Sequence, residues 1–162
     1  MMAIRGRDVE KAERERWIFE EFAGRAGLMV VPGSVESRLP PEPDILCRIE
    51  DQGPVAFELV ELIDQGLARS IARAAGEAVW TCDPTLEVAQ AKMRVRKYVT
   101  PHPMELVAYS MGGSVLPRDA WEERFAQRLQ DLVDGSAFRR LWVCEMAETK
   151  DLKGFLFVHP PL

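Results

Sequence analysis

Two acidic residues are the part of this 162-residue chain whose types and spacing are best suited to chemistry. Asp44 follows Pro43 and begins an apolar run over 44–49, and Glu58 lies inside a second apolar run over 55–62. Both runs have the composition of β-strands, and the connector between them contains Gly and Pro, which favour a turn. We therefore expect a β-hairpin that carries both acids.

The register of this hairpin decides whether the two carboxylates lie on the same face of the sheet. Side chains alternate along a strand, so a slip by one residue would separate them. With the turn centred on Asp51, Asp44 lies opposite Glu58. With the turn centred on Gln52, it lies opposite Val60, and in both registers the two acids project from the same side.

Two carboxylates on an otherwise apolar sheet face repel one another, and burial raises the free energy of ionising them unless a cation is close. A divalent metal ion would neutralise them. Mg²⁺ prefers oxygen ligands and keeps several of its waters, so two carboxylates and a backbone carbonyl are sufficient to bind it. The sequence therefore predicts a Mg²⁺ site on the hairpin.

Each acid also has a structural interpretation. Asp44 can cap a turn or stabilise the entry to its strand, and we weigh this equally with metal binding. Glu58 is flanked by apolar residues, so burying it without a metal ion requires a salt bridge, for which Arg48 across the hairpin is the candidate. At a sheet edge, Glu58 would instead face water. Glu61 is expected to begin the next helix, where negative charge is favourable.

The rest of the chain alternates predicted helices with predicted strands. The first helix runs from Asp8 to about Ala26, with Trp17 on its apolar face. Further helices are expected over 65–79, after Asp83-Pro84 and over 117–135, and strands over 28–31 (a strand or a buried extended segment), 104–111, 139–146 and 154–160. Helices interspersed with buried strands predict a single α/β domain over residues 1–162, in which a mixed β-sheet is flanked by helices.

Bulk composition excludes several classes of protein. Hydrophobic residues make up 47% of the chain and charged residues 29%, as in soluble globular domains. No apolar run approaches the roughly 20 residues that span a membrane, and the charged start is unlike a signal peptide, so we expect a cytoplasmic protein. The net charge of −5 means that any nucleic-acid binding needs a local basic patch. Cys47, Cys82 and Cys144 are expected to be reduced packing residues.

The Pro43-Asp44 pair, the turn and Glu58 in its apolar strand resemble the motif of the PD-(D/E)XK nuclease superfamily. The order of the predicted elements is similar to the restriction-endonuclease-like αβββαβ core over most of the chain. The resemblance implies that Asp44 and Glu58 hold Mg²⁺, with the carbonyl of Leu59 as a further ligand. It also implies that the metal ion activates water for attack on a phosphodiester of DNA.

The resemblance implies two more parts of the site. An additional acid is expected on the first helix, for which Glu20 and Glu21 are both candidates. The family's lysine lies two residues after the strand glutamate, and this position is Val60, which can neither position water nor offset negative charge. The nearest replacement is Lys92, on the helix predicted after Asp83.

A basic cluster surrounds this lysine. It could contact DNA phosphates, or form the solvated face of the helix, and comprises Lys92, Arg94, Arg96 and Lys97. Two functions are therefore carried forward. The first is a Mg²⁺-dependent nuclease acting on DNA. The second is a catalytically inactive nuclease-fold protein that binds nucleic acid or a protein partner, and a homodimer is compatible with either.

Overall fold

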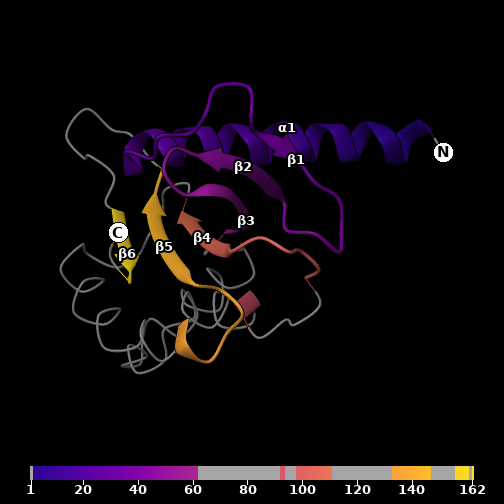
Figure 1. Cartoon of the computed structure of the whole chain (residues 1–162). Coiled ribbons are helices and arrows are strands. Elements are labelled where there is room, and N and C mark those ends of the chain that lie inside the picture. Colours follow the sequence, from indigo (N-terminus) through magenta and orange to yellow (C-terminus); the bar gives the residue numbers. More distant parts are fainter. Residues whose placement is uncertain (1, 62–91, 94–97, 111–132, 147–155, 161) are drawn as a thin grey trace, which may run out of the picture.

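The described part of the chain contains a long helix and a six-stranded sheet (Figure 1). The computed structural model describes residues 2–61, 92–93, 98–110, 133–146, 156–160 and 162. The elements are α1 (Met2–Ala26), β1 (Glu36–Ser37), β2 (Ile45–Ile49), β3 (Gly53–Glu61), β4 (Met104–Ser110), β5 (Arg140–Glu145) and β6 (Leu156–His159). The strands lie in the sheet in the order of the sequence, from β1 to β6.

The sheet is mixed. The pairs β1–β2, β2–β3 and β5–β6 are antiparallel, whereas β3–β4 and β4–β5 are parallel. The carboxyl ends of β3, β4 and β5 therefore lie at the same end of the sheet, where the antiparallel β2 begins. The predicted α/β class with a mixed sheet is confirmed.

The hairpin of β2 and β3 has the first of the two predicted registers. Ile49 pairs with Gly53, so the turn is centred on Asp51. Asp51 and Gly53 both have positive φ values, 68° and 82°. Aspartate and glycine tolerate this left-handed conformation better than most residues, which fixes the turn at this point in the sequence.

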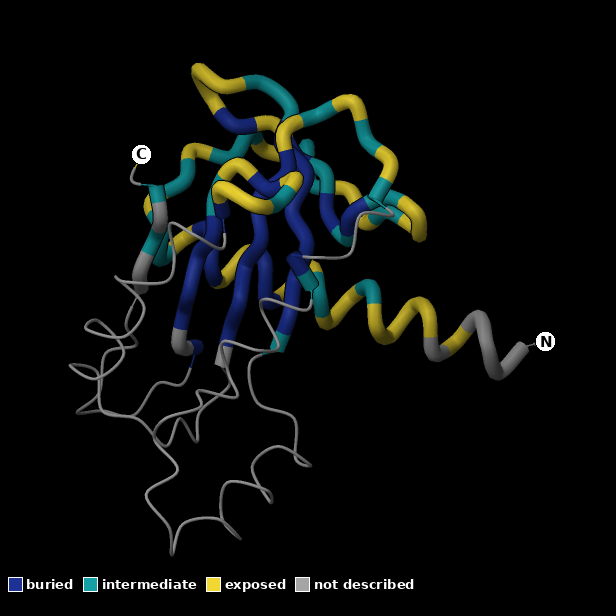
Figure 2. The backbone as a smooth tube through the Cα atoms, turned by 90° about the horizontal axis from the view of Figure 1, so that it is seen from below, coloured by how far each residue is buried: buried dark blue, intermediate teal, exposed yellow. Residues whose placement is uncertain are grey.

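Helix α1 packs on one face of the sheet through aromatic side chains. Phe19 lies against Phe57 of β3 with ring centroids 4.9 Å apart, and Phe22 meets Trp142 of β5 edge to face at 5.1 Å. Trp17 is 51% exposed, so its predicted place in the core is wrong. At 100° per residue, the buried stripe runs through Ile18, Phe19 and Phe22 and leaves Trp17 beside it. Figures 1 and 2 show that the N-terminal part of α1 extends past the sheet.

The opposite face of the sheet has its own apolar cluster. Its buried members include Ala56, Val60, Met93, Met104, Leu106, Ala108, Val133, Phe138, Leu141 and Val143. Cys47 and Cys144 are buried on the α1 side, as expected for packing residues, and Cys82 lies outside the described residues. Within the described ranges, no helix is long and apolar enough to span a bilayer.

The predicted strands at 104–111, 139–146 and 154–160 are confirmed as β4, β5 and β6. Of the segment 28–31, Val30 alone makes a β-bridge, to Ile49, and the short edge strand β1 was not predicted. Glu61 ends β3, so it does not begin a helix. The helices predicted over 65–79, after Asp83-Pro84 and over 117–135 lie outside the described residues, except for helical residues at 92–93 and 133–134.

A buried ion network secures the amino end of β4. Glu105 is 1% exposed and accepts hydrogen bonds from Arg139 at 2.8 Å, Arg140 at 3.1 Å and the indole N–H of Trp142 at 2.8 Å. Arg139 also donates to the side chain of Gln52 in the β2–β3 turn. This carboxylate is neutralised by two guanidinium groups, so it has a structural role.

Replacing Glu105 by Gln tests that role. The change leaves two partly buried guanidinium groups without their anion, and we expect the free energy of unfolding to fall by about 3 kcal/mol in urea denaturation. Glu36→Gln is the matched control, since Glu36 forms an exposed ion pair with Arg38 and should contribute less than about 1 kcal/mol. Equal effects of the two changes would contradict a structural role for Glu105.

Candidate functional site

The candidate site begins with the two hairpin acids. Ile45 pairs with Phe57, and one step further along the ladder Asp44 lies opposite Glu58. Glu58 is 3% exposed on β3, a central strand between β2 and β4. The two carboxyl groups lie close enough to hydrogen-bond when one of them carries a proton. The acids therefore meet on one face of the sheet, at the carboxyl end of β3.

Asp44 also organises the entry to β2. Its Oδ2 accepts a hydrogen bond of 3.0 Å from the backbone N–H of Leu59, and its carbonyl oxygen accepts one from the N–H of Arg38. The side chain thus takes the place of a ladder partner where β2 begins. This bond fulfils the structural interpretation of Asp44 and also fixes its carboxylate beside Glu58.

Burial dominates the electrostatics of Glu58. It raises the pKa of the carboxyl group to about 8, with further contributions from the hydrogen bond to Asp44 and from the charge of that residue. Two groups act in the opposite direction: the hydroxyl of Tyr98, which donates a hydrogen bond to Glu58, and the nearby ammonium group of Lys92. A metal-free Glu58 therefore keeps its proton to a higher pH than an exposed glutamate does.

Neither structural alternative for Glu58 is realised. Arg48 is exposed and pairs with Pro54, too far along the hairpin for the predicted salt bridge. β3 is a central strand, so its acid does not face water as it would at a sheet edge. The chain buries this carboxyl group without a guanidinium partner among the described residues.

Glu15 supplies the acid from helix α1. Its carboxyl group hydrogen-bonds with Asp44, and its pKa is raised by burial and then by the charge of Asp44. Lys11 forms an ion pair with Glu15 at 3.4 Å, which is the main cause of the raised pKa of that lysine; Asp44 and Glu58 add to the effect. The site thus contains three carboxyl groups, with Lys11 beside them.

The structure does not bring Glu20 or Glu21 to this site. Both are exposed, and Glu20 is bound by Arg16 at 3.2 Å. The helical phase is the reason: Glu15 lies one turn before Phe19, on the side of α1 that faces the sheet, whereas Glu20 and Glu21 turn away. Sequence reasoning could have found Glu15 from its spacing to the buried aromatic residues.

The structure describes two of the residues discussed for the role of the family's lysine, Val60 and Lys92. Val60 is buried in the apolar cluster, so position 60 serves packing. Lys92 is half-buried and close enough to lower the pKa of Glu58, as its predicted role requires. The other members of the predicted basic patch, Arg94, Arg96 and Lys97, lie outside the described residues. Tyr98 was missed, because nothing in its sequence context distinguishes it from a packing residue.

The arrangement of the acids limits the kind of metal ion that they could hold. Among the residues that the structure describes, no group of three or more His, Cys, Asp or Glu side chains is arranged to hold one. Asp44 contacts both Glu58 and Glu15, but the three do not converge on one point. Mg²⁺ is commonly bound by one or two carboxylates and waters, and the pair fits that pattern.

The raised pKa of Glu58 predicts how stability depends on pH. Its ordinary pKa is 4.5 and its folded pKa about 8, so between these values the folded state binds a proton that the unfolded state does not. In EDTA, the free energy of unfolding should therefore fall as the pH rises from about 4.5 to 8, by at most about 1.4 kcal/mol per pH unit from this group. Urea denaturation at a series of pH values measures this slope.

Glu58→Gln is the variant for this prediction, and Glu21→Gln is its control, because Glu21 is exposed. Glu58→Gln should flatten the slope between pH 4.5 and 8, and Glu21→Gln should preserve it. A slope unchanged in Glu58→Gln would mean that Glu58 is ionised in the folded protein throughout this range.

No protein-family model, curated protein or solved structure matches this chain.

Proposed function

We propose that this protein is a Mg²⁺-dependent nuclease that hydrolyses phosphodiester bonds of DNA, with a restriction-endonuclease-like core. The observation that carries the proposal is the pairing of the buried Glu58 with the half-buried Asp44 across the hairpin. The same sheet neutralises its other buried glutamate, Glu105, with two arginines, and none contacts Glu58 among the described residues. An acid pair without an arginine is what a site for a hard cation requires.

The arrangement of the elements supports the fold proposal. The described order is one helix, three antiparallel strands and then β4, which is parallel to β3. This order agrees with the αβββαβ core as far as the described residues extend. The acids lie at the carboxyl end of β3, and ligands of open α/β sheets bind at the carboxyl ends of the strands.

In this proposal, Asp44 and Glu58 bind Mg²⁺, and the carbonyl of Leu59 is a further ligand. The metal ion, when bound, supplies activated water and polarises the phosphate. Glu15 takes the part first expected of Glu20 or Glu21 and orients water from the α1 side. Lys92 takes the part of the missing lysine at position 60 and offsets negative charge that develops on the phosphate.

The residues around the acid pair have two further roles in this proposal: they position the Glu58 carboxyl group and they contact DNA. Tyr98 holds the Glu58 carboxyl group through its hydroxyl hydrogen bond, which limits the positions that this acid can take. Arg94, Arg96 and Lys97 follow Lys92 in the sequence and are proposed to contact DNA phosphates. Such a local patch is needed because the whole chain carries a net charge of −5.

One observation favours a second function. Val60 is packed into the core, so the chain has lost the family's lysine at its usual place without keeping a polar group there. A catalytically inactive nuclease-fold protein that binds nucleic acid or a protein partner, such as a second copy, would show this change. It would keep the acid pair as a remnant.

A plasmid-nicking assay separates these functions. Wild type should nick supercoiled DNA with Mg²⁺ or Mn²⁺ and not with EDTA. Glu58→Ala should lower the rate by more than the roughly 10- to 100-fold that follows loss of a group supporting a metal ligand. Glu21→Ala, which changes an exposed acid, should leave the rate unaltered. Equal rates for wild type and Glu58→Ala would refute nuclease activity at this site.

The helix acids provide a second comparison. Glu15→Gln should reduce nicking by about tenfold or more and shift the Mg²⁺ requirement to higher concentration, because it removes the carboxyl group next to Asp44. Glu20→Gln alters an acid of the same helix that is bound by Arg16 at the surface, so it should be neutral. A stronger effect from Glu20→Gln than from Glu15→Gln would mean that the helix presents a different face to the substrate.

A further inference from the structure

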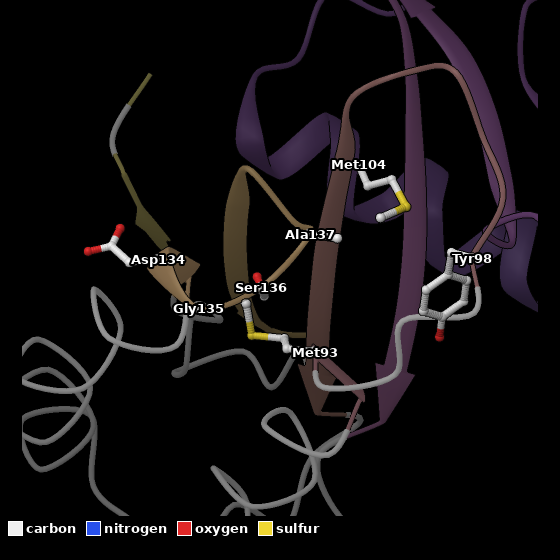
Figure 3. A pocket seen from close by; sticks show the side chains of 7 residues that line it. All are labelled: Met93, Tyr98, Met104, Asp134, Gly135, Ser136 and Ala137. Carbon is white, nitrogen blue, oxygen red and sulfur yellow. The ribbon is translucent and has the colours of Figure 1, made fainter.

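A pocket of about 310 Å³ opens on the sheet face that carries Glu58. Figure 3 shows the side chains that line it: Met93, Tyr98, Met104, Asp134, Gly135, Ser136 and Ala137. Met93 and Met104 are buried, so two thioether side chains form its inner wall. The loop over 134–137 is largely exposed and forms its rim. The pocket is therefore apolar inside and open to solvent at one side.

Tyr98 connects this pocket to the acid pair. Its ring lines the pocket, and its hydroxyl donates a hydrogen bond to Glu58. Phe138 packs against the ring nearly edge to face, with centroids 5.8 Å apart, and holds it in place. Tyr98 thus touches both the pocket and Glu58.

We propose that this pocket binds the base of a nucleotide whose phosphate lies beside Asp44 and Glu58. The position of the phosphate rests on the proposed function, whereas the binding of the base depends on the pocket alone. A base and its phosphate are linked by one sugar, and the pocket and the acids are linked by Tyr98. The geometry therefore suits a single nucleotide that spans both.

The size and lining of the pocket favour a planar aromatic ring. Ligand pockets commonly measure about 300 to 1,000 Å³, so this one is at the small end and suits one ring system better than a peptide or a lipid chain. Bases stack on aromatic side chains whatever their sequence, and thioethers make favourable contacts with aromatic rings. Tyr98, Met93 and Met104 supply both kinds of contact.

The rim provides polar contacts for the edge of the ring. Ser136 bonds to the carbonyl of Val133 and receives the N–H of Phe138, so its hydroxyl shapes the loop. Gly135 and Ala137 also line the opening, and neither residue has a side chain large enough to close it. The hydroxyl and main-chain groups of this loop are of the kind that suits the donor and acceptor groups on the edge of a base.

Titration of the full-length protein with free nucleosides tests the proposal. The probes are deoxyadenosine, deoxyguanosine, deoxycytidine and thymidine, added in EDTA and followed by NMR chemical shifts, with deoxyribose 5-phosphate as the probe without a base. Ala137→Trp should fill the pocket and weaken nucleoside binding by about tenfold or more. Met29→Trp is the matched control, since it places the same indole at an exposed position outside the pocket.

The outcomes separate this proposal from the nuclease proposal. Nucleoside binding that is lost in Ala137→Trp and kept in Met29→Trp supports the base site, even if no nicking is found. Failure of every nucleoside to bind wild type at millimolar concentration would overturn the base site and leave the metal-dependent chemistry standing. Binding that is equal in wild type and Ala137→Trp would overturn it as well, with circular dichroism confirming that the variant is folded.

Discussion

The burial of Glu58 opposite Asp44 is the constraint on which the rest of this site depends. A carboxyl group in a central strand must be protonated, paired with a cation or bound to a metal ion, because an isolated buried charge is too costly. The hairpin register brings a second carboxyl group to it, and α1 adds a third through Glu15. Several carboxyl groups thus lie together at a position where apolar residues would be more favourable for stability. A bound ligand is the best explanation for this costly arrangement.

The two buried glutamates of the sheet show the difference between a structural and a functional acid. Glu105, at the amino end of β4, meets two arginines and an indole N–H. Glu58, near the carboxyl end of β3, meets an acid, a phenol and a more distant lysine. The first group is fully compensated within the protein. The second lacks such compensation, which is why we propose that it binds a cation, and the parallel strands place it at one end of the sheet.

The sequence was sufficient for the hairpin because its signals are local. Alternation along the strands places both acids on one face in either of the two predicted registers, and the turn at Asp51 and Gly53 selects the register in which Asp44 lies opposite Glu58. The helix acid was misassigned because the helical phase depends on which residues the sheet buries. Phe19 and Phe22 point inward, so Glu15 and not Glu20 reaches the site.

Other parts depend on contacts between distant segments. Tyr98 reaches Glu58 from forty positions further along the chain, and no local pattern predicts such a contact. The predicted pairing of Glu58 with Arg48 failed because the register that brings Asp44 opposite Glu58 places Arg48 opposite Pro54, too far along the hairpin. Local sequence patterns were therefore enough to identify Asp44 and Glu58 as candidate site residues. The side chains that contact these acids depend on tertiary packing, so the sequence did not predict them.

The most direct test of this account is a crystal structure of the protein soaked with Mn²⁺, with anomalous diffraction used to find the ion. The account predicts an anomalous peak within bonding distance of both the Asp44 and Glu58 carboxyl groups in wild type, and no peak there in Glu58→Gln. A well-ordered site without manganese, in which Asp44 and Glu58 still share their hydrogen bond above pH 8, would contradict it.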